Sequence, residues 1–262
     1  MMAAGLVAGF VAGLFGIGGG FMVVPALFLV LPLLGGEKAQ YAHIAIGTSA
    51  ATIIVTSLRS LRAHASRGAV EWEVLKTWAP WIVLGSMLGV ILAGHVDGRG
   101  LTLIFASGVM LMSLNFIVPK LGDRVISQEM PTGMLRAGIA GGLGAFSSLL
   151  GIGGGTIAIM VMTVCGRSIH RAIATASGIG ALIAIPSSFG FMLIGLHQPG
   201  LPWGSIGYVD MPAAMAIGSM SILTAPLGAA AAHSLPAAPL KRLFGAYLVF
   251  VSALMFRNAM KM

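Results

Sequence analysis

Charged side chains are scarce in this chain of 262 residues, and acidic ones are the scarcest. Only 8% of the residues are charged, compared with roughly 25% in an average soluble domain. Hydrophobic residues make up 57% of the sequence. These two values exclude an ordinary soluble domain and predict a protein whose main solvent is the lipid bilayer.

The few carboxylates all lie in loops or at the ends of apolar segments. Proton pumps and many proton-coupled carriers place acids within the membrane, and a cation substrate usually needs such a counter-charge. The sequence also lacks the phosphate-binding loop typical of ATP-driven transport. Any transport is therefore predicted to be passive, coupled to an ion through neutral groups, or driven by the membrane potential. The carboxylates are Glu37, Glu71, Glu73, Asp97, Asp123, Glu129 and Asp210.

A single cysteine, Cys165, excludes an internal disulfide, and the histidines are not spaced as metal ligands are. We therefore expect neither a metal ion nor a cofactor. The net charge of +8 is spread over short loops instead of being gathered on one amphipathic surface, which argues against a nucleic-acid partner. Nothing in the sequence indicates an oligomeric state.

Apolar segments that are long enough to cross a bilayer, or nearly so, account for most of the chain. The alternating pattern of a membrane barrel is absent, so these segments are predicted to be helices, which satisfy their own backbone hydrogen bonds in lipid. We expect an all-α integral membrane protein with one membrane domain. The segments lie at about 3–34, 41–58, 74–94, 101–118, 133–166, 170–195, 209–232 and 239–256.

The pentapeptide Gly-Ile-Gly-Gly-Gly occurs twice, at residues 16–20 and 151–155, each time within an apolar segment. Shorter matches follow both copies in the same order. They pair residues 43–48 with 170–175, 68–71 with 207–210, and 85–87 with 218–220. Internal duplication is common in transporters, which bind substrates where the halves meet. The chain is therefore predicted to contain a first membrane repeat at 1–119, a polar linker at 120–130 and a second membrane repeat at 131–262.

These motifs resemble those of the sulfite exporter TauE/SafE family of bacterial membrane permeases. The resemblance rests on Gly-Ile-Gly-Gly-Gly-x-x-x-x-Pro at 16–25, on His-x-Ala-Ile-Gly-Thr-Ser at 43–49, and on their copies in the second half. The second half departs from the pattern at Met160 and at residues 175–177. The resemblance implies a multi-pass transporter of the bacterial cytoplasmic membrane that exports sulfite, small organosulfonates such as sulfoacetate, or related anions. The residues themselves indicate only a small anionic substrate and leave direction and coupling open.

Two arrangements of the halves are open, and the basic residues distinguish them. If segments 3–34 and 133–166 each cross once, the halves are parallel and the basic residues divide nine to six between the two sides. If each segment turns back at its glycines as a re-entrant hairpin, each repeat has a hairpin and three crossings, the repeats are inverted, and the division is eleven to four. Basic residues gather in cytoplasmic loops, so inverted repeats are favoured, with Arg67 and Arg167 inside and Lys38 outside.

The glycine motifs are candidate substrate sites. A helix that stops and restarts within the bilayer leaves unpaired backbone N–H groups at its new N-terminus, and such groups bind anions. Without a Cβ, glycine lets an oxyanion approach the backbone directly. Close helix packing is the alternative explanation, although three successive glycines are more than packing requires. The candidate ligands are Gly18, Gly19, Gly20, Gly153, Gly154, Gly155 and the hydroxyl of Thr156.

Hydroxyls on the next segment of each half are candidates to complete the site, namely Thr48, Ser49, Thr175 and Ser177. The alternative is that they only pack or bond to the preceding helical turn. His43 and His170 occupy matching places at the starts of these segments, where an interfacial or helix-start contact competes with a secondary role in gating.

Two other functions remain open from the sequence. An anion channel uses the same half-helices to line a pore, and flux kinetics separate it from a carrier. An intramembrane hydrolase with Ser177 and a histidine as its dyad is disfavoured, because the motif is duplicated in helices whose histidines face opposite sides of the membrane. We therefore expect no enzymatic activity.

Overall fold

The computed structural model describes residues 2–15, 18–117, 125, 127–231 and 237–260, and it is predominantly helical. The predicted linker at 120–130 falls largely outside the described residues. In chain order the α-helices are α1 (Met2–Phe15), α2 (Gly20–Leu34), α3 (Tyr41–Ala65), α4 (Trp72–Gly94), α5 (Gly98–Ile117), α6 (Gly133–Leu150), α7 (Gly155–Val164), α8 (Ile169–Gly195), α9 (Met211–Ala231) and α10 (Ala237–Ala259), with a short 3-10 helix η1 (Lys38–Gln40) before α3.

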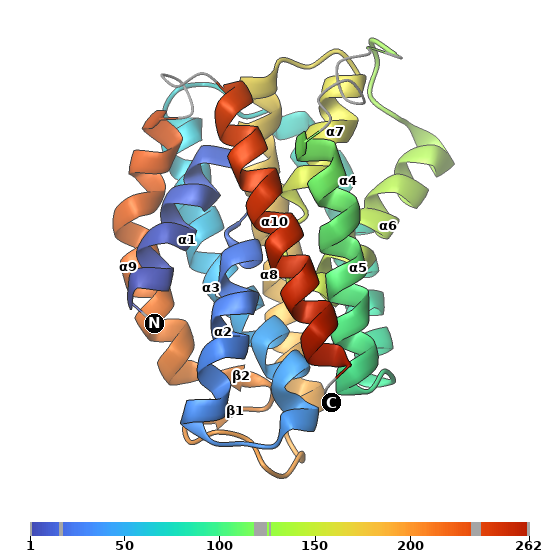
Figure 1. Cartoon of the computed structure of the whole chain (residues 1–262). Helices are drawn as coiled ribbons and strands as arrows, with labels where there is room; N and C mark the ends of the chain where they lie inside the picture. Colours follow the sequence, from blue (N-terminus) through green and yellow to red (C-terminus); the bar gives the residue numbers. More distant parts are fainter. Residues whose placement is uncertain (1, 16–17, 118–124, 126, 232–236, 261–262) are drawn as a thin grey trace.

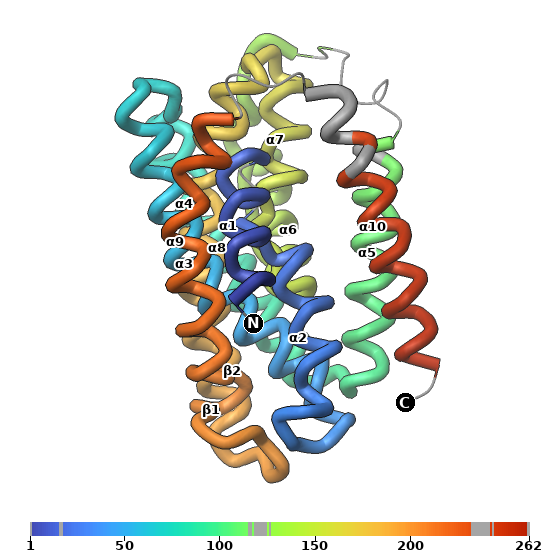
Figure 2. The backbone as a smooth tube through the Cα atoms, turned by 60° about the vertical axis from the view of Figure 1, so that its left-hand side comes forward, coloured from blue at the N-terminus to red at the C-terminus, as the bar shows by residue number. Residues whose placement is uncertain are grey.

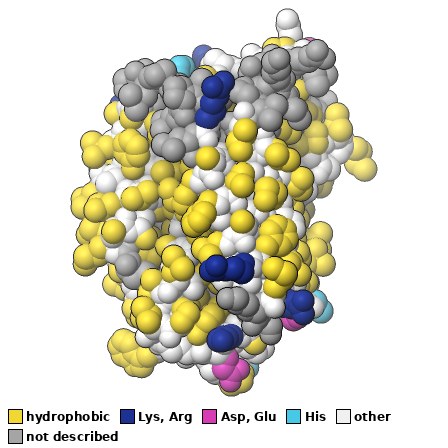
Figure 3. Space-filling model, in the orientation of Figure 1, with side chains coloured by type: hydrophobic (Ala, Val, Ile, Leu, Met, Phe, Trp, Pro, Cys, Tyr) yellow, Lys and Arg dark blue, Asp and Glu magenta, His cyan; other side chains and the backbone are white. Residues whose placement is uncertain are grey.

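Several of these helices are built to cross a membrane. Five are long and apolar enough within the described residues: Lys38–Ala65, Trp72–Gly94, Gly133–Leu150, Ile169–Gly195 and Met211–Ala231. Large hydrophobic side chains remain exposed along them, as expected where lipid replaces water as the solvent. Figure 3 shows hydrophobic side chains covering much of one face. The predicted class, an all-α multi-pass membrane protein, is confirmed.

Both segments that carry the glycine motif are interrupted there. The first apolar segment forms α1 and α2, and the fifth forms α6 and α7. In Figures 1 and 2, α1 rises and α2 descends, whereas α6 descends and α7 rises. Each interruption therefore reverses the direction of the chain, and the two reversals point opposite ways.

Helices α3 and α8 pack against each other in the interior of the bundle. Near its end, α3 places Ser60 beside Ser177 of α8, and a Cβ added at Gly180 would lie 2.6 Å from the Oγ of Ser57. Near its start, a Cβ added at Gly47 would lie 2.9 Å from the Cβ of Phe191. The two helices are therefore antiparallel, and most of the small and hydroxyl residues that face between them are buried.

A small antiparallel hairpin precedes α9, although the sequence predicts helices alone. Its strands are β1 (Ser205–Ile206) and β2 (Val209–Asp210), with Ser205 opposite Asp210 and Ile206 opposite Val209. Gly207 turns between them with a φ of 55°, a conformation that favours glycine. The backbone N–H of Tyr208 donates to the carbonyl of Phe191 at 3.1 Å, which fixes the hairpin against α8.

Candidate functional site

The two glycine motifs meet in the interior of the bundle. A Cβ added at Gly18 would lie 3.3 Å from the Cα of Gly153, and one added at Gly20 would overlap the carbonyl oxygen of Gly151. Backbone therefore contacts backbone, which only residues without side chains permit. The structure brings together two segments separated by more than half of the chain.

Glycine is required here by conformation as well as by space. Gly19 precedes α2 with a φ of 78°, and Gly154 precedes α7 with a φ of 64°. Gly151 ends α6 with a φ of 61°. Residues other than glycine rarely adopt such φ values. Glycine at these positions therefore allows one helix to end and the next to begin.

The start of each second helix offers backbone N–H groups. In α7 the N–H of Ala158 donates to the carbonyl of Gly154 at 3.1 Å, so the N–H groups of residues 155–157 have no acceptor within the helix. In α2 the N–H groups of Met22 and Val23 both donate to the carbonyl of Gly19, at 2.9 and 3.2 Å. The N–H groups of Gly20 and Phe21 precede the first hydrogen bond of α2 and have no acceptor within the helix. Both helix starts carry positive potential.

Hydroxyls of α3 hold both interruptions in place. Ser49 Oγ donates to the carbonyl of Gly151 at 2.8 Å. Thr56 Oγ1 lies 3.2 Å from the carbonyl of Gly18 and equally far from those of Thr52 and Ile53, so its one proton is shared among them. One helix of the first half therefore supports the glycine motif of its own half and that of the other. Among the predicted hydroxyls of α3 and α8, Ser49 is therefore hydrogen-bonded to a described residue of a motif.

Thr48 and Thr175 take part in a reciprocal exchange between the halves. Thr48 Oγ1 accepts the backbone N–H of Asp210, just before α9, at 2.9 Å. Thr175 Oγ1 accepts the backbone N–H of Glu71, just before α4, also at 2.9 Å. Each threonine keeps its own hydroxyl proton for a further bond. These matching contacts secure the entry of one helix from each half.

Ser177, the remaining predicted hydroxyl, lies 3.0 Å from the Oγ of Ser60 and 3.2 Å from the carbonyl of Ile173. Neither contact is with a histidine, which gives the hydrolase alternative no support.

Three buried hydroxyls near the glycine motifs have no hydrogen-bond partner among the described residues. They belong to Ser57, Ser147 and Thr156, whose exposures are 1%, 0% and 8%. Ser57 Oγ would lie 3.4 Å from a Cβ at Gly18, and Ser147 Oγ 2.9 Å from one at Gly154. Unpartnered buried hydroxyls are uncommon because desolvation is costly, so these three are available to a ligand.

The sequence predicted Thr156 in this group but missed Ser57 and Ser147. A signal for Ser57 was present, since it lies eight residues after Ser49 and therefore on the same face of a helix.

The two histidines have unlike surroundings. His43 is buried, with Nε2 3.0 Å from the carbonyl of Ala93 and its ring stacked on Tyr208 at a centroid distance of 4.7 Å. His170 is exposed at the start of α8. The part of the chain that the structure describes holds no group of three His, Cys, Asp or Glu side chains placed to bind a metal ion.

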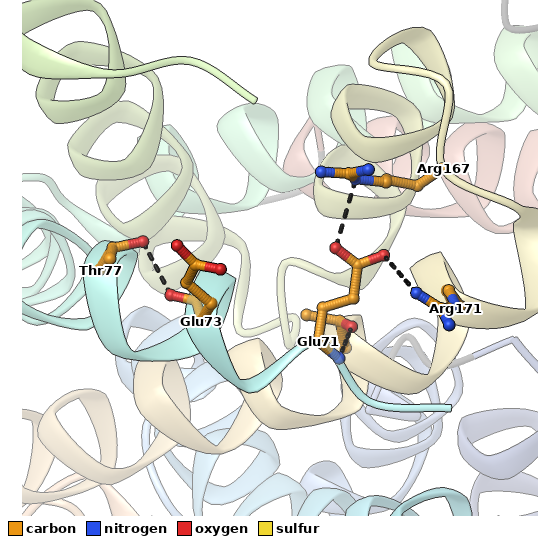
Figure 4. A network of polar contacts seen from close by, with 6 residues as sticks. Glu71, Glu73, Thr77, Arg167 and Arg171 are labelled. Atoms are coloured by element: carbon orange, nitrogen blue, oxygen red, sulfur yellow. Dashed lines mark hydrogen bonds and ion pairs between the residues drawn. The ribbon is translucent and has the colours of Figure 1, made fainter. Parts of the chain in front are cut away.

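An ion-pair cluster joins the start of α4 to the start of α8. The Glu71 carboxylate lies 3.3 Å from Nε of Arg167 and 3.9 Å from a terminal nitrogen of Arg171. Figure 4 shows both arginines directed at this carboxylate. The Glu71 side chain is 13% exposed, compared with 38% and 61% for the arginines. The segment before α4 and the segment before α8 therefore lie at the same end of the bundle.

Apolar helices that cross a membrane, with two interrupted ones meeting in the interior, define a multi-pass membrane transporter. The family model "Sulfite exporter TauE/SafE" matches residues 1–255, and the chain belongs to this family. A probable membrane transporter protein of Haemophilus influenzae is 34% identical over 96% of this chain and 95% of its own length. Another, from Methanocaldococcus jannaschii, is 26% identical over 86% of this chain and 82% of its own. No solved structure matches.

Proposed function

We propose that the protein exports small sulfur-containing oxyanions, such as sulfite or organosulfonates, which bind where the two glycine motifs meet. The observation that carries this proposal is the contact of Gly18 with Gly153 beside unpartnered buried hydroxyls. Backbone N–H groups at two helix starts and the hydroxyls of Ser57, Ser147 and Thr156 supply donors, as an oxyanion requires. The family description supports the substrate class.

Binding by neutral donors suits a substrate that has to leave again. A helix N-terminus attracts an anion with partial charges and does not need a fixed cation in the membrane. We propose that four further hydroxyls surround the glycine motifs, namely those of Thr48, Ser49, Thr175 and Ser177. Of these, Thr48 and Thr175 retain a proton to donate, whereas Ser49 has given its proton to Gly151.

The two motifs must separate to admit an anion, because their backbones are in contact. We propose that the halves are inverted repeats of about 1–119 and 131–262, each with a re-entrant hairpin and three crossings, and that they rock against each other. Two observations support inversion. The paired helices at the two interruptions reverse in opposite senses, and Glu71 contacts Arg167 and Arg171. The contact of Glu71 with these arginines is the one expected if Arg67 and Arg167 lie on the cytoplasmic side together.

The membrane potential is sufficient to drive export. In the cytoplasmic membrane of a bacterium, where we propose the protein resides, the inside is negative. A divalent anion that leaves gains about 4.6 kcal/mol per 100 mV, at roughly 2.3 per charge. We therefore propose uniport without a cofactor.

Transport into or out of liposomes that contain the purified protein tests the function. The panel is sulfite, sulfoacetate, thiosulfate, sulfate and acetate. We expect saturable uptake and counterflow with the sulfur oxyanions. Conductance of many ions without counterflow would indicate an anion channel instead, and the absence of flux for every sulfur anion would contradict the proposal.

Single-cysteine labelling tests the arrangement of the halves. In a Cys165→Ala background, cysteines that replace Lys38 and Arg67 are expected to react from opposite sides of the membrane. A cysteine that replaces Arg167 is expected to react from the same side as the one at Arg67. Reaction of these last two from opposite sides would make the repeats parallel.

A further inference from the structure

An apolar groove of about 460 Å³ lies between α10 and the pair formed by α1 and α2. Its walls include Phe10 and Leu14 of α1, Met22 of α2, and Tyr247 and Phe250 of α10. Figure 2 shows α10 beside α5, away from α1 and α2. The volume is within the roughly 300–1,000 Å³ of ligand pockets.

Aromatic rings from three helices meet at the groove. Phe244 stacks on Phe15 with a centroid distance of 5.1 Å and meets Phe21 edge-on at 6.1 Å. It also stacks on Tyr247 at 6.1 Å. Beyond these contacts α10 and α1 separate, and Phe250 is 67% exposed. These ring contacts join α10 to α1 and α2 at the groove.

An apolar cavity beside lipid does not stay empty, because its walls would lose the dispersion contacts that close packing supplies. Lipid acyl chains are present throughout the bilayer core and can fill such a groove. Arg242 adds a second element of recognition, because it is exposed and precedes Ala246, a wall residue, by one helical turn. The backbone of Arg242 lies about 6 Å along the helix from that of Ala246, so an arginine borders the groove, and a basic side chain there suits a phosphate attached to acyl chains.

We propose that this groove is a binding site for one phospholipid with an anionic headgroup, its acyl chain lying between α1 and α10 and its phosphate paired with Arg242. The site is separate from the meeting point of the glycine motifs. It does, however, touch the first interruption from outside, since Phe15 and Met22 flank that motif and line the groove. Its occupant therefore supports α10 and the interrupted segment together.

Lipid retention tests the site. The wild-type protein and two variants are purified in mild detergent, and bound phospholipid is counted by native mass spectrometry. Ala246→Trp fills the groove, whereas Ala253→Trp, two turns along the same exposed face of α10, lies outside it and is the matched control. We expect one retained phospholipid in the wild type and in Ala253→Trp, and at least tenfold lower occupancy in Ala246→Trp.

Headgroup selectivity tests the role of Arg242 without altering the groove. After delipidation, dioleoyl phosphatidylglycerol is expected to bind severalfold more tightly than dioleoyl phosphatidylcholine. Arg242→Gln removes this preference, and Arg257→Gln, at the far end of the same helix, retains it. This measurement keeps the proposal open to refutation even if Ala246→Trp does not fold.

Equal binding of the two headgroups by the wild type would overturn the proposal, and so would any of three results of the retention test. The first is a wild-type protein that retains no phospholipid. The second is equal retention by the two tryptophan variants. The third is an Ala246→Trp variant whose oligomeric mass falls while its lipid content is unchanged, which would assign the groove to a second copy of the chain.

Discussion

The two threonine contacts between the halves have the same geometry but different electrostatic surroundings. Thr48 accepts the N–H of Asp210 and Thr175 that of Glu71, both at 2.9 Å. The Glu71 carboxylate faces two arginines. Asp210, only 2% exposed, instead accepts the N–H of Ala213 at 2.9 Å and so caps α9. One end of the bundle is therefore held by an ion-pair cluster, and the other by a helix cap beside the stacked rings of His43 and Tyr208.

The two threonine contacts are therefore more alike than the side chains that surround them. Partly exposed ion pairs are weakened by salt, whereas a buried helix cap is screened much less. The four predictions that follow compare residues of the first half with residues of the second.

The largest effect is expected at the glycines. In Gly19→Leu with Gly154→Leu, each new side chain meets a positive φ and nearby atoms: a Cβ would lie 2.8 Å from the carbonyl of Ala8 in one half and 2.9 Å from Ser147 Oγ in the other. We expect at least a hundredfold loss of sulfite transport. Gly138→Leu is the control, because Gly138 has open space around its Cβ position. A monodisperse double variant with normal rate and affinity would exclude the paired site.

A smaller effect is expected at the threonines. Thr48→Val and Thr175→Val each leave one backbone N–H without its acceptor, which costs about 1–3 kcal/mol of stability when the group is buried. Thermal unfolding in detergent measures this, and Thr48→Ser and Thr175→Ser should restore most of the loss. If only one of the two valine variants unfolded at a lower temperature, the two contacts would not be equivalent.

Substitutions of Ser57 and Ser147 are expected to weaken anion binding without lowering stability. Their hydroxyls have no partner among the described residues, so Ser57→Ala and Ser147→Ala should not destabilise the protein. Each removes a bond to a charged ligand, worth about 1.5–3 kcal/mol, which corresponds to roughly 10–150-fold weaker sulfite binding. The test measures sulfite affinity by calorimetry and thermal unfolding on the same samples. Unchanged affinity in both variants would remove these hydroxyls from the site.

The smallest effect is expected at the two carboxylates. Glu71→Gln should lower stability by less than about 1 kcal/mol, because its arginine partners are partly exposed. The difference from wild type should vanish at high salt. Asp210→Asn should show no salt dependence, since asparagine also caps helices. Melting temperatures at low and high salt measure both, and equal salt dependence of the two variants would contradict the ionic assignment of the first closure.

Much of this architecture was predicted from the sequence because its physical causes are local. Apolar length determined the helices, and the glycine pentapeptides determined where two of them stop and restart. The family followed from the same motifs. The hairpin before α9 was missed, because two-residue strands leave too little pattern to detect and this pair is held by the contact of Tyr208 with α8.

Only the tertiary structure decided which residues face one another. The sequence placed Thr48 and Thr175 as equivalents, but their bonds to Asp210 and Glu71 join residues more than 100 positions apart. It did not distinguish Ser57, whose hydroxyl has no partner among the described residues, from Thr56, whose hydroxyl lies 3.2 Å from the carbonyl of Gly18. Hydrophobicity and backbone conformation act within a few residues, and the sequence records them directly. The meeting of the two glycine motifs and the groove beside α10 depend on how helices pack, which is settled only when the whole bundle is assembled.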